Sequence, residues 1–129
     1  MRIDEMPAGR EMDVLIAENI MGWAVHQRNT AWWVKVADEN EVTTEVMGFT
    51  YGKDRFAPST NIADAWEVVK KMGNCLFACG RSDAGAWEAY FFFVNSGVGK
   101  LSEAHGDTAP LAICRCALMA MGVKINGDS

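Results

Sequence analysis

Hydrophobic residues are densest near the C-terminus, where they fill nearly every position between Thr108 and Gly122. A helix that is apolar on all sides is either buried in a core or spans a membrane. This stretch is too short to span a bilayer, and it contains Pro110 and Arg115. Asp107 or Thr108 can cap its start through a side-chain oxygen, and Gly122 suits its end. The pattern therefore predicts a central core helix.

Two other segments follow the helical period. The first covers residues 9–22 and places its apolar side chains along one face, together with Asn19. The second covers residues 61–72, with Ser59 or Thr60 as its expected cap. Its stripe consists of Ile62, Ala65, Trp66, Val69 and Met72. Both patterns are typical of helices that lay one face against a core.

Alternating or β-branched segments at residues 31–37, 42–51, 75–80 and 86–94 predict strands. The last two are separated by the turn residues Ser82–Gly85 and predict a hairpin. The strand at 86–94 is apolar on both faces, which is typical of a central strand covered on both sides. Residues 95–106 are expected to form a glycine-rich loop.

The predicted order is α-β-β-α-β-β-α in a single domain, residues 1–129. We expect an α+β fold, in which helices pack on both faces of a small antiparallel β-sheet. The 129 residues include five tryptophans, half of the chain is hydrophobic, and the net charge is −5. This charge argues against binding a nucleic-acid polymer. The apolar content exceeds what one small core usually hides, so we expect at least a homodimer.

Residues 1–6 show no secretory signal, and no stretch reaches transmembrane length. We therefore expect a cytoplasmic protein with no membrane partner. The cysteines at 75, 79, 114 and 116 have poor spacing for one zinc site and contain no C-x-x-C motif. They are interpreted as reduced thiols, and no metal or cofactor is expected.

Catalytic motifs are lacking in the sequence. Neither His26 nor His105 stands beside a recognisable nucleophile motif. The segment His105-Gly-Asp107 would serve as a base with an orienting carboxylate, or as a simple loop and cap. Gly97-Val-Gly99-Lys100 would approach a phosphate, or form a plain flexible loop. We expect no catalytic residues and a protein that is not an enzyme.

Arg115 is the only charge on the predicted core helix. One interpretation pairs it with an internal carboxylate or lets its stem cross apolar surface to water. The other uses its planar guanidinium to bind a phosphate or a partner's carboxylate. Aromatic residues are core by default, or stacking platforms for a base. The candidate ligand-binding residues are Arg115, Arg81, Trp87, Tyr90, Lys100 and His105.

Three segments carry a resemblance to a known family. They are Gly9-Arg-Glu-Met-Asp-Val-Leu-Ile-Ala-Glu with Met21-Gly-Trp23, then Pro58 to Val69, and then Thr108 to Leu118. Together they resemble the phage ABA sandwich domain family. The sequence is also similar to phage sponge proteins that inhibit Thoeris defence, which bind a cyclic ADP-ribose-type signal as oligomers without degrading it. The resemblance implies a phage protein that acts in the cytoplasm of the infected bacterium.

Three classes of function follow from these observations. The first is a phage-encoded, non-enzymatic binding protein that sequesters a nucleotide-derived immune signal and so counteracts anti-phage defence. Its ligand would be a small anionic nucleotide, such as a cyclic ADP-ribose isomer or a cyclic oligonucleotide. The alternative is a phage structural or interaction protein that acts through protein contacts, with no small-molecule ligand. An enzyme that acts on nucleotides is the third class, and no catalytic set supports it.

Overall fold

The computed structural model describes residues 2–28, 31–37, 43–48, 56–73, 75–95 and 98–123. The chain begins with the short 3₁₀ helix η1 (Ile3–Glu5) and continues through α1 (Arg10–Asn19), β1 (Ala24–Arg28), β2 (Ala31–Ala37) and β3 (Thr43–Gly48). It then forms α2 (Ile62–Lys71), β4 (Leu76–Arg81), β5 (Trp87–Asn95), β6 (Val98–Gly106) and α3 (Ala109–Ala120). The α+β class is confirmed, as are the three expected helices.

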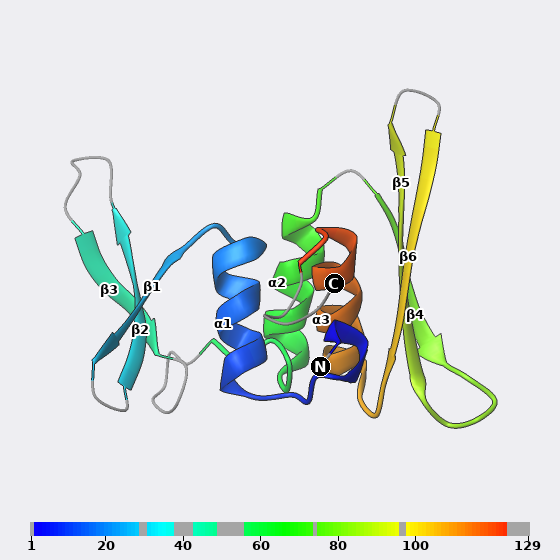
Figure 1. Ribbon diagram of the computed structural model, residues 1–129, viewed down its shortest axis with the longest axis horizontal. Coiled ribbons are helices and arrows are strands. Elements are labelled where there is room, and N and C mark those ends of the chain that lie inside the picture. The colour runs from blue at the N-terminus through cyan, green and yellow to red at the C-terminus, as the bar shows by residue number, and fades with distance from the viewer. Residues whose placement is uncertain are drawn as a thin grey trace.

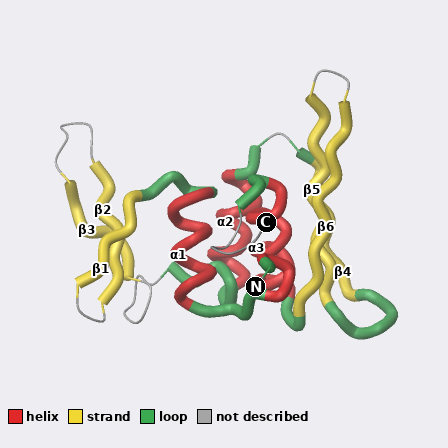
Figure 2. The backbone as a smooth tube through the Cα atoms, viewed as in Figure 1, coloured by secondary structure: helices red, strands yellow, loops and turns green. Residues whose placement is uncertain are grey.

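The described strands form two antiparallel sheets, each with three strands. The N-terminal sheet has the order β1-β2-β3, and the C-terminal sheet has the order β4-β5-β6. Figure 1 shows the helices as a layer between these sheets, and the backbone tube in Figure 2 shows the same order, with strands on both outer sides. Among the described residues, helices therefore cover one face of the C-terminal sheet, whereas the sequence led us to expect helices on both faces.

Helix α3 lies at the centre of this arrangement, as predicted. Eight of its residues are buried, and it packs on β5 and β6, on α1 and α2, and on η1. Thr108 Oγ1 accepts a hydrogen bond from Leu111 N at 3.3 Å and caps the helix, Pro110 lies in the first turn, and Gly122 is left-handed at φ 72°. The cap, the first turn and the end of this helix were all predictable from residue type.

The start of α2 differs from the expectation. Its cap is Asn61, whose side-chain oxygen accepts from Asp64 N at 3.1 Å. The expected cap Ser59 is instead buried, where its Oγ accepts from Gly9 N at 3.0 Å. Ser59 N also donates to Asp13 Oδ1 at 2.8 Å, on the buried side of α1. A long-range tie between α1 and the turn before α2 thus takes the residue that the local pattern assigned to a cap.

The C-terminal sheet pairs β5 with both β4 and β6. Its register aligns Phe77 with Phe91, and Phe91 with Ser102, on the face that meets α3. We call this the inner face. Phe91 is fully buried there and packs on Phe77 in a tilted arrangement, with ring centroids 5.0 Å apart and planes at 43°. The prediction that the strand around 86–94 is central in its sheet is confirmed.

On the opposite, outer face of β5, the side chains of the sheet itself make local contacts. Glu88, Tyr90 and Phe92 alternate with the buried positions of β5. Glu88 and Tyr90 hydrogen-bond to each other, and the Phe92 ring lies over Gly99, whose added Cβ would come within 2.7 Å of it. Polar pairing and an aromatic ring over a cross-strand glycine cover this face locally.

Strand β6 occupies residues that were expected to form a loop. Its inner face carries small residues, with Ser102, Ala104 and Gly106 all buried under α3. Leu101, Glu103 and His105 alternate with them on the outer face. The glycine content that suggested a loop instead permits a close approach between strand and helix. Strand β1 was also absent from the expectation, and β3 begins at Thr43, inside the predicted range.

Buried apolar residues of the three helices, β5 and β6 form one core cluster. Its largest fully buried side chains include Phe91, Met12, Ile16, Ile113 and Leu118. The described helices all fall short of the length and apolar character that crossing a bilayer requires.

We predict that Gly106→Ala destabilises the fold, because a Cβ there would lie 2.9 Å from Ala112 N and 3.1 Å from Leu111 Cγ. Overpacking of this kind costs about 1–3 kcal/mol. Gly80→Ala is the matched control, since an added Cβ at Gly80 meets nothing within 4 Å. Urea unfolding measures both. Equal stability of Gly106→Ala and the parent would contradict the close approach of α3 to β6.

Candidate functional site

Arg115 emerges from the middle of α3 and is anchored by main-chain carbonyls. Its Nε and Nη2 donate to the Met6 carbonyl oxygen at 3.0 and 2.8 Å, and its Nη1 donates to the His105 carbonyl oxygen at 2.9 Å. The guanidinium therefore joins the N-terminal segment, α3 and β6. These partners are neutral carbonyls, whereas the sequence left open a carboxylate, water or a ligand.

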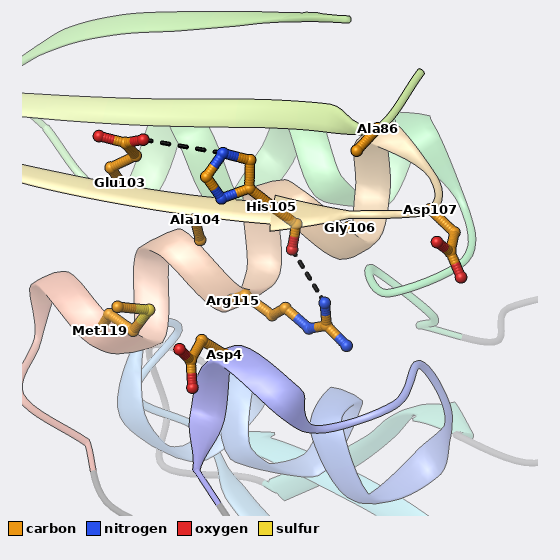
Figure 3. Close-up of a pocket in the computed structure, with 9 residues that line it drawn as sticks. All are labelled: Asp4, Ala86, Glu103, Ala104, His105, Gly106, Asp107, Arg115 and Met119. Carbon is orange, nitrogen blue, oxygen red and sulfur yellow. Dashed lines mark hydrogen bonds and ion pairs between the residues drawn. The ribbon is translucent and has the colours of Figure 1, made fainter. Parts of the chain in front are cut away.

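A cavity of about 260 Å³ opens beside this guanidinium. Figure 3 shows the residues that line it, which come from η1, from the turn before β5, from β6, from the turn after β6 and from α3. The guanidinium shares the cavity with the carboxylates of Asp4 and Asp107, whereas the Glu103 carboxylate points to the outer face, toward the His105 ring (Figure 3). The site thus combines one cation with several hydrogen-bond acceptors. The lining residues are Asp4, Ala86, Glu103, Ala104, His105, Gly106, Asp107, Arg115 and Met119.

The main-chain carbonyls use only some of the hydrogen-bond donors of the Arg115 guanidinium. An arginine carries five N–H groups in a fixed plane, and the hydrogen bonds to Met6 and His105 use three of them. Two N–H groups are therefore free of these carbonyls. Because the main chain holds the plane in position, a ligand that met these donors would not need to order the side chain.

His105 presents different chemistry on its two sides. Its carbonyl contacts Arg115, while its imidazole lies on the outer face of β6, with Nε2 at 3.2 Å from Glu88 Oε1 and 3.7 Å from Glu103 Oε1. Tyr90 completes this group, since its hydroxyl donates to Glu88 Oε2 at 2.7 Å. We call Glu88, Tyr90, Glu103 and His105 the outer-face polar group.

Hydrogen bonding shifts two pKa values in the outer-face polar group in opposite directions. The bond from Tyr90 lowers the pKa of Glu88, and the hydrogen bond and charge of His105 act in the same sense. The bond to Glu88 raises the pKa of Tyr90 to about 12, helped by burial and by the charges of Glu88 and Glu103. The group thus favours an ionised Glu88 beside a neutral Tyr90.

The structure brings some candidate residues together and separates others. Arg81 pairs with Trp87 across the β4–β5 ladder, and its guanidinium carbon lies 6.0 Å from the Trp87 ring centroid. Trp87 in turn pairs with Gly106, which lines the Arg115 cavity. Arg81, Trp87, His105 and Arg115 therefore lie around the same end of the C-terminal sheet. The Trp87 ring packs partly against the core.

Lys100 lies at the other end of β6. It lies five positions before His105, which is about 17 Å along a strand. Its Nζ donates to the Ala120 carbonyl oxygen at 3.1 Å, at the C-terminus of α3. A cation there compensates the partial negative charge of the helix end. Lys100 thus contacts the end of α3 at a distance from the cavity.

Two acidic residues that line the cavity, Asp4 of η1 and Glu103 of β6, were missed from the sequence. Asp107, in the turn before α3, was considered there only as an orienting carboxylate for His105 or as a cap. The alternation of Leu101, Glu103 and His105 would have indicated a strand with polar side chains on one face. Asp4 carries no comparable signal, because its proximity depends on the long-range contact between Met6 and Arg115.

The cysteines show no clustered site. Cys114 and Cys116 are buried, Cys75 is half-buried and Cys79 is exposed, and all four are free thiols. Burial raises the pKa of each thiol above its ordinary value, most strongly for Cys114. Within the described residues, no group of three or more His, Cys, Asp or Glu side chains is placed to hold a metal ion.

We predict that Tyr90 ionises near pH 12, because ionisation would place a phenolate against the Glu88 carboxylate. The folded-state pKa lies above the ordinary value of 10.0, so this bond stabilises the fold fully below pH 10 and loses its effect as the pH rises toward 12. Difference ultraviolet titration of the parent against Tyr90→Phe isolates this residue from Tyr51. Glu88→Gln should move the titration to lower pH. If the pKa of Tyr90 is the same in Glu88→Gln as in the parent, the pairing of Tyr90 with Glu88 is contradicted.

Comparison with protein-family models gives a match over most of the chain. The model of the family described as "Phage ABA sandwich domain" matches residues 14–118. This range runs from within α1 to within α3 and covers most of the chain. No curated protein matches the sequence. The match includes both sheets and the helix that carries Arg115, and the chain belongs to the phage ABA sandwich domain family.

Proposed function

We propose that this phage ABA sandwich protein is a non-enzymatic binding protein that sequesters a nucleotide-derived immune signal in the Arg115 cavity. The observation that carries the proposal is a guanidinium held by two main-chain carbonyls at the wall of an open cavity. A positioned guanidinium recognises a phosphate through directional, charge-assisted hydrogen bonds. The resemblance to Thoeris-inhibiting sponges supports the same class of ligand.

The carboxylates of the cavity limit which kinds of ligand can bind there. Asp4 and Asp107 accept hydrogen bonds and oppose additional negative charge. A ligand rich in hydroxyl or amino donors satisfies these acceptors, and one phosphate group reaches Arg115. Cyclic ADP-ribose isomers and cyclic oligonucleotides combine ribose hydroxyls, base amino groups and phosphates. We therefore place the phosphate at Arg115 and the ribose or base donors at the carboxylates.

Binding without turnover is favoured by the state of the candidate nucleophiles. A thiolate is the reactive form of cysteine, and the pKa of each of the four thiols is raised. The imidazole of His105 contacts Glu88 on the outer face, while only its carbonyl meets the Arg115 guanidinium. These positions suit ligand retention better than covalent or acid–base catalysis.

The alternative, an interaction protein without a small ligand, is supported by a different surface. Leu76, Phe92 and Leu101 pair across the outer face and form an apolar row. Leu76 is 72% exposed and Leu101 is 58% exposed. Exposed apolar rows of this kind favour protein contacts. This surface lies on the outer face, so the two functions use separable residues.

We predict that a member of a panel of cyclic ADP-ribose isomers and cyclic dinucleotides raises the melting temperature of the protein, since a ligand of the folded state stabilises it by mass action. Arg115→Lys keeps the charge but loses the planar fork, and should weaken binding at least about tenfold, equivalent to ~1.4 kcal/mol. Lys71→Gln, an exposed change on α2, is the matched control. Calorimetry gives the dissociation constants, and urea unfolding checks that each variant is folded.

The outcomes separate the three classes of function. Ligand recovered intact after denaturation of the complex supports sequestration, and a converted ligand would identify an enzyme. If a folded Arg115→Lys variant binds the ligand as tightly as the parent, then Arg115 does not contact the ligand. If no nucleotide shifts the melting temperature, the proposal fails, and the interaction surface becomes the better explanation.

A further inference from the structure

Strand β4 forms one edge of the C-terminal sheet. Among the described strands it pairs with β5 alone, through an uninterrupted register from Leu76–Phe92 to Arg81–Trp87. The main-chain groups on its other side therefore have no strand partner in the described part of the chain. A row of such groups is a template for pairing with another strand.

The two edges of this sheet differ in charge. Strand β6 carries Lys100, Glu103 and His105, which are side chains of the kind that keep edge strands from pairing. Strand β4 has the sequence Leu-Phe-Ala-Cys-Gly-Arg, so its only charge is Arg81 at the last position. It also contains no proline or bulge. Strand β4 therefore lacks the features that protect an edge strand from pairing with another strand.

Exposed hydrophobic side chains flank this edge on both faces of the sheet. On the outer face, Leu76 is 72% exposed. On the inner side, Trp66 of α2 meets Phe77 edge to face, with ring centroids 5.9 Å apart, and remains 49% exposed. Ile62, one helical turn from Trp66, is 57% exposed. A strand added at β4 would lie against hydrophobic side chains on either side of the sheet.

We propose that β4 pairs antiparallel with β4 of a second copy of this chain, with a two-fold axis through Ala78. The two sheets then join into one sheet of six strands. A two-fold axis perpendicular to the sheet keeps the outer faces together, so residues of the same parity lie opposite each other. The pairs are Ala78 with Ala78, Leu76 with Gly80, and Phe77 with Cys79.

Size and charge favour a second copy over an unrelated partner. Each large side chain, Leu76 or Phe77, faces a smaller one, Gly80 or Cys79, so the strand complements itself. Arg81 faces Cys75, which avoids a like-charge pair across the axis. The contact leaves the Arg115 cavity out of the interface, and the proposal is independent of the proposed function.

Substitutions that introduce a charge at Ala78 test this arrangement. Ala78 is exposed, and Ala78→Lys would place two ammonium groups opposite each other across the axis. Ala78→Glu does the same with carboxylates. Leu101→Lys, an exposed change on the outer face of β6, is the matched control. Light scattering after size exclusion, at micromolar concentration, gives the mass of each protein, and circular dichroism confirms that each is folded.

The proposal expects a dimer for the parent and for Leu101→Lys, monomers for Ala78→Lys and Ala78→Glu separately, and a dimer again when these two variants are mixed. Opposite charges across the axis would then replace the like-charge pairs. A monomeric parent, a dimer that survives both Ala78 changes, or a mixture that stays monomeric would each overturn the proposal.

Discussion

The structure depends on the burial of α3 on every side. A helix without a polar face cannot lie on the surface of a sheet, because one side would remain in water. Here β5 and β6 cover one side, while α1, α2 and η1 cover the others. The fold therefore places its helices in the interior and its sheets outside (Figure 1). Burying a Leu or Ile side chain stabilises a fold by roughly 1.5–3 kcal/mol, and α3 buries Leu111, Ile113 and Leu118.

The same constraint determines the chemistry of Arg115. A cation within an apolar helix requires hydrogen-bond partners, and the main chain supplies them from Met6 and His105. These bonds hold the N-terminal segment against β6 and thereby form the wall of the cavity. One side chain therefore links the packing of α3 to the proposed binding site. The carboxylates of Asp4 and Asp107 would oppose further negative charge on the proposed ligand.

Local signals made much of the fold predictable. The cap at Thr108, the left-handed Gly122 and the apolar stripe of α2 each depend on neighbouring residues. So does the β4–β5 hairpin, whose turn residues and flanking strands are contiguous. The central position of β5 in its sheet was also predictable, because apolar residues occupy both faces of this strand. These features need no knowledge of distant segments.

Long-range contacts account for what the sequence did not predict. Ser59 bonds Gly9 and Asp13 instead of capping α2. The glycines of β6 permit close approach to α3 and to Phe92 instead of forming a loop. The contribution of Asp4 to the cavity likewise requires the contact between Arg115 and Met6. In each case, a residue with a clear local preference takes a role set by a partner far along the chain.

Native-state hydrogen exchange tests the central place of α3 most directly. Amides that open only when the whole protein unfolds exchange with the free energy of global unfolding. Our account predicts that the amides in the middle of α3, around Cys114 and Ala117, exchange with this free energy. In the monomeric Ala78→Lys variant, the amides of the edge strand β4 should exchange through smaller openings. Exchange of the α3 amides through openings that leave β5 and β6 protected would contradict the claim that this helix holds the fold together.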